Sequence, residues 1–201
     1  MKNIYIYSGK GAYQAKDVEN FLSVFDFKYE RVCEHDIGLL SGNEGRKIFI
    51  VPGGKIRDYL PSWEKRGIKI IRNFVKNGGV YIGICAGSYV AGKKFRGNKG
   101  LEFYNDEIPH IKYQGIIKAK NKSGKVIELI AENGPDFSRI KEGKILFIDF
   151  CGNAQILQIK FGKGQVLLFS SHPEGSVYYS KHPKKFSGAK YFTSLLKNIG
   201  A

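Results

Sequence analysis

A glycine-rich stretch from Gly78 to Gly92 constrains the fold of this chain more than any other segment. After a glycine pair and the short apolar run Val80–Ile84, it places Cys85 between Gly83 and Gly87. This spacing is typical of a nucleophile elbow, a tight strand-to-helix turn that exposes one reactive side chain, with cysteine where many hydrolases carry serine. Because the residue at such a turn has a strained backbone, and bulk two positions away would clash, the elbow requires both glycines.

Cys85 is therefore a candidate nucleophile. A helix that begins at this residue would point its N–H groups and the positive end of its dipole at the sulfur, which favours the thiolate. The alternative is a buried cysteine in a parallel strand, with glycines that only close the turn. This stretch alone leaves both interpretations open.

The composition narrows the class of protein. A chain of 201 residues predicts a single domain, covering residues 1–201, with a full hydrophobic core. Hydrophobic residues make up 42% and charged residues 25%, which is typical of soluble globular proteins. No apolar run approaches the roughly 20 residues of a membrane helix, so no membrane partner is expected. The run Met1–Tyr7 is too short for a signal peptide and predicts a strand.

The cysteines bear on compartment and chemistry. Cys33, Cys85 and Cys151 are far apart and odd in number, so neither a disulfide framework nor a zinc site is indicated. We therefore expect no metal, no cofactor and a reducing, cytoplasmic location. Cys33 and Cys151 fall in apolar runs and are expected to be protected, which would leave Cys85 as the one reactive thiol.

The net charge of +15 raises the question of a polyanion partner. Of the 33 basic residues, seven are arginine, and the lysines are spread from Lys2 to Lys197. Proteins that read nucleic acid sequences favour arginine and cluster their charge. Nucleic acid is therefore not the expected partner, although a polyanion ligand or attraction of an anionic substrate stays open.

The first half of the chain alternates strands and helices. The strands are expected at 2–7, 29–33, 47–51 and 80–84, and the helices at 15–25 and 62–76. Short connections between them predict a parallel sheet with right-handed crossovers. The loops that follow Val51 and Ile84 would then meet at the carboxyl edge of the sheet, where such sheets place their sites.

The second half is rich in β-structure. Strands are expected at 112–120, 126–131, 145–150, 155–161 and 165–171, with hairpin turns at 121–124 and 162–164, and a final helix at 188–198. The last hairpin leads into His172-Pro173-Glu174.

This His-Pro-Glu sequence is the second candidate motif. In an extended chain residues i and i+2 point to the same side, and Pro173 biases His172 towards the extended region. Glu174 could therefore orient the imidazole and stabilise its charged form. The alternative is a surface segment without a role. His35, His110 and His182 have no carboxylate at i+2 and are expected at the surface or in loops.

A third motif, Pro52-Gly53-Gly54, follows the apolar run that ends at Val51. Such a turn leaves backbone N–H groups without side-chain cover, which an oxyanion hole requires. The alternative is a plain tight turn.

In this order, the segments 51–54, 83–87 and 172–174 resemble those of the class I glutamine amidotransferase-like superfamily. The closest resemblance is to the family named after the N-terminal domain of biotin–protein ligases, through the segments 83–89 and 162–164 leading to 172–174. The resemblance spans essentially the whole chain. It implies an α/β fold, a flavodoxin-like three-layer sandwich with a mainly parallel central sheet, a nucleophile elbow and added C-terminal β-hairpins.

The resemblance also implies roles for individual residues. Cys85 would be the nucleophile, His172 the general base and acid, and Glu174 the orienting carboxylate. The backbone N–H groups of Gly54 and Ala86 would form the oxyanion hole.

Substrate-binding candidates are Gly53, Ser88 and Tyr89. Members that hydrolyse glutamine usually carry glutamine four residues after the nucleophile, where this chain has Tyr89. The substrate is therefore left as a small-molecule amide or acyl compound, and no oligomeric state is indicated.

Three classes of function are consistent with the sequence. The first is a cysteine hydrolase of the amidotransferase type. The second is a non-catalytic or regulatory module that binds a ligand or another protein, such as a biotin ligase or a synthetase. The third is a polyanion-binding protein, whose binding to nucleic acid would depend steeply on salt concentration.

Overall fold

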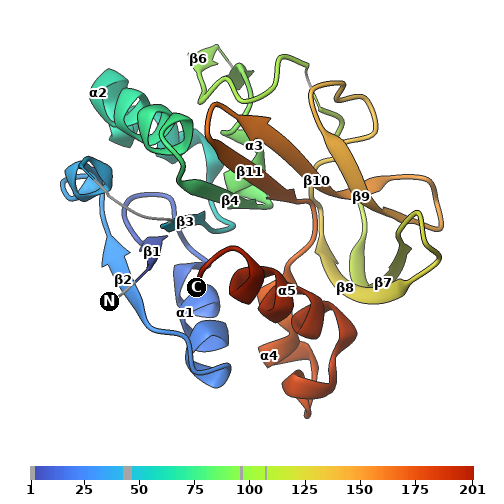
Figure 1. Cartoon of the computed structure of the whole chain (residues 1–201). Helices are drawn as coiled ribbons and strands as arrows, with labels where there is room; N and C mark the ends of the chain where they lie inside the picture. Colours follow the sequence, from blue (N-terminus) through green and yellow to red (C-terminus); the bar gives the residue numbers. More distant parts are fainter. Residues whose placement is uncertain (1–2, 43–46, 96, 107) are drawn as a thin grey trace.

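The structure is a computed structural model that describes residues 3–42, 47–95, 97–106 and 108–201. Its core is a nine-stranded sheet of the strands β1 (Ile4–Tyr7), β2 (Tyr29–Val32), β3 (Ile48–Val51), β4 (Val80–Ile84), β7 (Gln114–Lys120), β8 (Val126–Glu132), β9 (Lys144–Asp149), β10 (Ala154–Phe161) and β11 (Gly164–Phe169). The strand order is β2-β1-β3-β4-β11-β10-β9-β7-β8 (Figure 1).

One half of the sheet is parallel. Strands β2, β1, β3, β4 and β11 run in the same direction, with Ile50 of β3 beside Ile82 of β4. Every residue of β1, β3 and β4 is buried, because these strands are apolar throughout and helices cover both of their faces. The parallel sheet and the buried strand 47–51 are therefore confirmed, with the strand starting one residue later.

The other half is antiparallel. β11 pairs with β10, β10 with β9, β9 with β7 and β7 with β8. The two predicted hairpins are present, one closing at Phe161 and Gly164 and the other at Lys120 and Val126. Through these pairings the second half of the chain extends the sheet beyond β4, which would otherwise be an open edge.

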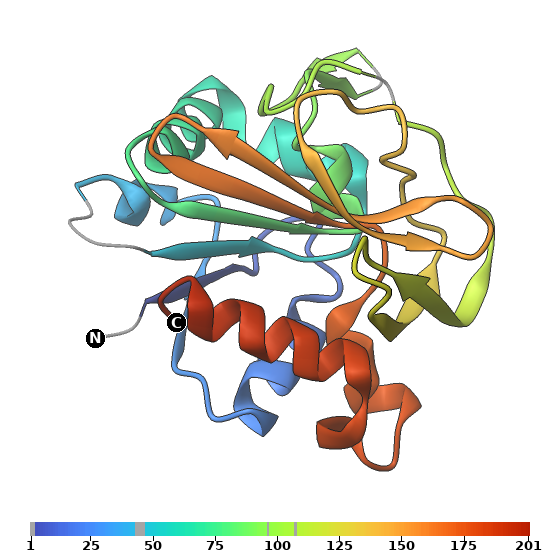
Figure 2. The same ribbon diagram turned by 45° about the vertical axis from the view of Figure 1, so that its right-hand side comes forward.

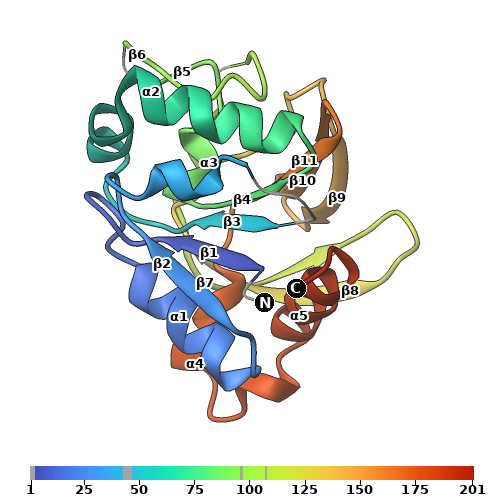
Figure 3. The same cartoon turned by 60° about the vertical axis from the view of Figure 1, so that its left-hand side comes forward.

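Helices form a layer on each face of the sheet (Figures 2 and 3). One layer contains α2 (Ile56–Lys76) and α3 (Ala86–Tyr89), and the other contains α1 (Ala15–Val24), α4 (Ser176–Tyr179) and α5 (Ser187–Asn198). Short 3-10 helices occur at η1 (Ile37–Leu40), η2 (Pro173–Gly175) and η3 (Pro183–Lys185). The predicted three-layer sandwich is therefore confirmed.

The start of α2 differs from the prediction, which placed it at Ser62. The helix begins at Ile56, contains Pro61, and is kinked at Glu64, whose φ is 54°. Proline without its N–H is typical of a first helical turn, so the sequence pattern at Pro61 resembled a helix start. The earlier start places Tyr59 inside the helix, next to the loop after β3.

The segment between α3 and β7 carries a small separate ribbon, β5 (Lys94–Phe95) with β6 (Asn98–Lys99). Buried apolar side chains from both halves of the sheet form one hydrophobic cluster, from Ile4 to Ile199. None of the helices in the described part of the chain has the length and apolarity needed to cross a bilayer.

Candidate functional site

Cys85 occupies the turn between β4 and α3 with a φ of 47° and a ψ of −104°, a conformation rare outside glycine. A Cβ added to Gly87 would lie 2.1 Å from the carbonyl oxygen of Val51, and one added to Gly83 would lie 2.7 Å from that of Gly87. Both glycines are therefore required by close backbone contacts. The predicted elbow and its strained cysteine are confirmed.

Ser88 lies directly beneath the elbow. It is fully buried, and its hydroxyl is 2.8 Å from the carbonyl oxygen of Gly83 and 2.9 Å from that of Phe169. A hydroxyl has one proton, which these two acceptors share. Ser88 thus ties the elbow to β11. That it contacts substrate stays a prediction, and its present contacts give it a structural role.

The Pro52-Gly53-Gly54 loop faces the elbow from the end of β3. The buried hydroxyl of Tyr59 donates to the carbonyl oxygens of Pro52 at 3.0 Å and Gly53 at 3.2 Å. The N–H of Gly87 donates to the same Pro52 oxygen at 3.2 Å. These three bonds fix the loop against the elbow.

The loop and the elbow each contain a backbone N–H group without a hydrogen-bond acceptor in the described part of the chain. Across residues 3–42, 47–95, 97–106 and 108–201, the N–H groups of Gly54 and Ala86 donate to no acceptor. Gly54 cannot carry a side chain, because a Cβ would lie 2.0 Å from the carbonyl oxygen of Gly11. One bare N–H group follows the candidate nucleophile and the other lies on the loop held against the elbow, and the resemblance implies that these two groups form an oxyanion hole.

His172 follows β11 and immediately precedes η2. Its φ of −104° and ψ of 91° are extended, as Pro173 predicts. Nδ1 of His172 lies 2.8 Å from Oε1 of Glu174, and the two side chains are 3% and 1% exposed. The predicted pairing of the imidazole with the carboxylate is confirmed, and it directs Nε2 away from Glu174.

The electrostatics around His172 favour its charged form. Burial acts to lower the pKa of His172, but the Glu174 carboxylate and then the Cys85 side chain raise this pKa well above the usual 6.5. Nε2 is buried and makes no well-aligned hydrogen bond within the described residues. Cys85 and His172 are nonetheless near neighbours, because β4 and β11 are adjacent and the Cys85 N–H donates to the Phe169 carbonyl oxygen at 2.9 Å.

Glu132 is a site residue that no sequence motif indicated. It ends β8, and its carbonyl oxygen lies 3.8 Å from Sγ of Cys85, a residue 47 positions away. Its Oε2 lies 4.0 Å from Nε2 of His172. Gln14 donates to Oε2 at 3.1 Å and Tyr179 donates to Oε1 at 3.0 Å. An antiparallel bridge between Ile130 and His172 brings β8 to this place.

Tyr89 is the last residue of α3, the short helix that follows Cys85. It is buried, and its hydroxyl lies 2.7 Å from Nδ1 of His110. Burial and then the charge of Cys85 raise the pKa of Tyr89, so its hydroxyl stays protonated. Gly53 lies against His172, since a Cβ there would approach the imidazole Cε1 to 2.9 Å. His35, His110 and His182 are exposed, as predicted.

The prediction for the other two cysteines is wrong. Cys151 is exposed in the turn after β9, which ends at Asp149, and Cys33 is half-buried just beyond β2. Both predicted strands end earlier than their apolar runs suggested. The backbone N–H of Cys151 donates a hydrogen bond to the Asp149 carboxylate at 2.9 Å, which closes the turn. The thiol of Cys33 donates a hydrogen bond to Oδ2 of Asp36 at 2.8 Å.

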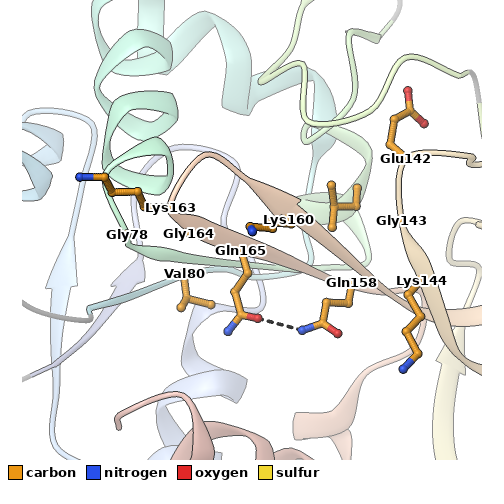
Figure 4. A pocket seen from close by; sticks show the side chains of 11 residues that line it. Gly78, Val80, Glu142, Gly143, Lys144, Gln158, Lys160, Lys163, Gly164 and Gln165 are labelled. Carbon is orange, nitrogen blue, oxygen red and sulfur yellow. Dashed lines mark hydrogen bonds between the residues drawn. The ribbon is translucent and has the colours of Figure 1, made fainter.

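A cavity of about 230 Å³ adjoins the candidate site, lined by Gln14, Asp17, Glu132, His172, Glu174, Gly175, Tyr178 and Tyr179. A larger cavity of about 450 Å³ lies at the other end of the sheet, where β4 and β11 begin (Figure 4). Its lysines point in different directions, as Lys144 and Lys163 show, and Gln158 and Gln165 bond to each other at 2.8 Å. Among the described residues, its lining contains no cysteine, serine, threonine or histidine, whereas His172 and Glu174 line the smaller cavity.

Residues 2–107 match the family model described as "Biotin-protein ligase, N terminal". The chain belongs to this family. The family accounts for the elbow and for the loop after β3, which lie within the matched residues.

Individual relatives and structures extend the likeness to the whole chain. The biotin–protein ligase of Schizosaccharomyces pombe is 27% identical over 98% of this chain, which spans only 38% of that protein. The PurQ subunit of phosphoribosylformylglycinamidine synthase from Pelagibacter ubique is 28% identical over 84% of this chain and 72% of its own length. The structure of PurLQS from Thermotoga maritima matches with a TM-score of 0.70 at 14% identity, covering 99% and 100% of the two chains. That structural likeness shows the glutamine amidotransferase-like fold.

Proposed function

We propose that this protein is a cysteine hydrolase or amidotransferase-like enzyme that cleaves an amide or related acyl bond. The observation that carries the proposal is the strained Cys85 beside the buried His172–Glu174 pair. A strained backbone conformation is costly and persists where a site depends on it. A buried charged imidazole is likewise costly unless it serves a neighbouring group.

The first half of the reaction is acyl transfer to sulfur. The thiolate of Cys85 attacks the carbonyl carbon, and the N–H groups of Gly54 and Ala86 bind the oxyanion that forms. The C–N bond then breaks, and the amine departs with the proton from Nε2 of His172. The products are a Cys85 thioester and a neutral imidazole, with Glu174 holding Nδ1–H in place.

The second half is hydrolysis. Nε2 of His172, now neutral, removes a proton from a water molecule as its oxygen attacks the thioester carbonyl. The same two N–H groups bind the second oxyanion. The C–S bond breaks, the carboxylic acid leaves, and the thiolate–imidazolium pair is restored. If another nucleophile replaces water, the same steps give a transferase.

The alternative is a non-catalytic or regulatory module on the same fold. The observation in its favour is that both curated relatives named above are larger or multi-part: one extends well beyond this chain and the other is called a subunit. Under this alternative the protein would work with a partner enzyme, such as a ligase or synthetase, and Cys85 would react without turning over.

A burst experiment separates these two functions. With p-nitrophenyl acetate, we expect one equivalent of p-nitrophenol per protein in a fast phase, followed by slow turnover, and an acetyl group on Cys85 by mass spectrometry. Cys85→Ala should abolish the burst, and Cys151→Ser, which removes the exposed thiol, should preserve it. His172→Ala should slow deacylation. A burst without any turnover in the wild type would favour the regulatory module.

A further inference from the structure

We propose that the cavity beside His172 binds a positively charged amine group of the substrate, with Glu132 as its principal counter-charge. This inference rests on the proposed function and deepens it, because it assigns the charge of the substrate. It concerns the 230 Å³ cavity between the start of α1, the end of β8 and α4.

The charge of the cavity lining is opposite to that of the protein. The chain carries a net charge of +15, yet the lining contains three carboxylates, on Asp17, Glu132 and Glu174, and no lysine or arginine. No lysine or arginine in the described part of the chain forms an ion pair with any of the three. His172 supplies one positive charge, which leaves the cavity negative.

One carboxylate oxygen of the lining lacks a hydrogen-bond partner. Oε2 of Glu174 is buried and makes no hydrogen bond within the described residues, and the Glu174 side chain is only 1% exposed. Buried polar groups without a partner are costly, and native proteins tolerate few of them. In this cavity a ligand that donates hydrogen bonds would satisfy the free carboxylate oxygen.

Glu132 is held ready for such a ligand. The His172 N–H donates to the carbonyl oxygen of Ile130 at 2.7 Å, and residues i and i+2 of a strand share a face, so Glu132 lies over the imidazole. Its two carboxylate oxygens are oriented by Gln14 and Tyr179. Both are neutral donors, so they position the carboxylate without cancelling its charge.

The rim of the cavity is aromatic. Tyr178 and Tyr179 line the cavity and are 53% and 52% exposed, so both are accessible to a ligand that enters from solvent. The faces of tyrosine rings attract cations. Carboxylates at the base and tyrosines at the rim together suit an ammonium group better than a neutral or anionic one.

The same charges work against a free carboxylate near the scissile bond. A substrate with a carboxylate close to the reacting amide, such as glutamine, would bring its negative charge towards Glu132. We therefore expect an amide that carries an amine and lacks a nearby carboxylate.

The test uses alkylation of Cys85, which requires no turnover. Three small reagents of different charge are compared, namely 2-bromoethylamine, iodoacetamide and iodoacetate, and the label is quantified at each cysteine by peptide mass spectrometry. Cys151, exposed in the same molecule, corrects for intrinsic reactivity and for the overall charge. Glu132→Gln removes the proposed counter-charge, and Glu128→Gln removes an equal charge from the same strand.

Relative to Cys151, we expect Cys85 to prefer bromoethylamine over iodoacetate by about tenfold, the scale of one nearby unit charge at intermediate dielectric. Glu132→Gln should reduce this preference by about fivefold or more, and Glu128→Gln should leave it unchanged. Equal preferences at Cys85 and Cys151, or no effect of Glu132→Gln, would overturn the inference. If Glu132→Gln does not fold, two measurements replace it. These are the preference of Cys85 for bromoethylamine over iodoacetate in the wild type and the same preference in Asp17→Asn.

The outcome is separable from that of the proposed function. A charge preference at Cys85 without a p-nitrophenol burst would support the cation site and contradict the hydrolase activity. A burst without any charge preference at Cys85 would support the hydrolase activity and contradict the cation site.

Discussion

Nδ1 of His172 lies 2.8 Å from a carboxylate oxygen of Glu174, two residues along the chain, and both side chains are almost completely buried. This contact determines which ring nitrogen is available. With Nδ1 donating to Glu174, Nε2 is the atom left for proton exchange with Cys85 and with a substrate. The pairing also keeps the imidazole charged, because Glu174 and Cys85 outweigh the effect of burial on its pKa.

The raised pKa of His172 predicts how stability changes with pH. A group whose pKa is raised on folding stabilises the protein fully below its unfolded pKa, here about 6.5, and loses this effect as the pH rises through the folded pKa. His172→Gln should therefore cost most near pH 6 and progressively less towards pH 10.

Urea denaturation of the wild type and His172→Gln at several pH values between 6 and 10 measures this difference. His182→Gln, which changes an exposed histidine, is the control and should show no such trend. A stability difference that stays constant, or grows at alkaline pH, would contradict the charged imidazole.

The second prediction concerns Gly87. A methyl group there would meet the Val51 carbonyl oxygen at 2.1 Å, and backbone cannot move aside as a flexible side chain can. We expect Gly87→Ala to lower the free energy of unfolding by about 2–4 kcal/mol and to disturb the elbow. Gly38→Ala, where a methyl group would meet nothing within 4 Å, should change it by less than about 1 kcal/mol. Denaturation of the two variants in urea compares them, and equal losses would count against the close contact.

Much of this site follows from local sequence motifs. The spacing around Cys85 specifies an elbow because its glycines are dictated by contacts within a few residues and with the neighbouring strand. The His172–Glu174 pair is likewise local, since an extended His-Pro-Glu segment puts both side chains on one side. The apolar strands predicted the parallel half of the sheet for a similar reason, because burial on both faces requires continuous apolar runs.

Glu132 could not be found in this way. It reaches His172 because β8 bridges the loop after β11 through Ile130, a contact between distant parts of the chain. Nothing in the residues around Glu132 encodes that pairing. The exposed Cys151 was missed for a related reason: whether an apolar run continues as a strand depends on its partner strand, and here β9 ends at Asp149.

The third prediction tests the loop after β3. Tyr59 is buried in α2, and its hydroxyl holds the carbonyl oxygens of Pro52 and Gly53. Tyr59→Phe should therefore loosen the Gly54 amide, at a cost of about 1 kcal/mol in stability. Because an oxyanion-hole donor contributes mainly to the transition state, the rate of the p-nitrophenol burst should fall by about tenfold or more while its amplitude remains. A loss of stability with an unchanged burst rate would show that Gly54 does not bind the oxyanion.

The last prediction concerns the relative reactivity of two thiols. Cys151 is exposed and Cys85 is half-buried, so accessibility alone would favour labelling of Cys151. The charged imidazole of His172 opposes this order, because it stabilises the thiolate of Cys85, and the thiolate is the species that reacts. We therefore expect the ratio of label at Cys85 to label at Cys151 to rise as the pH falls from 8 to 6.

Timed labelling with iodoacetamide, followed by peptide mass spectrometry, measures this ratio. His172→Gln should remove the rise, since the variant keeps the shape of the site but loses the charge. His182→Gln should keep it. If Cys151 is labelled first at every pH in the wild type, His172 does not activate Cys85, and the arrangement of the two residues has a structural role alone.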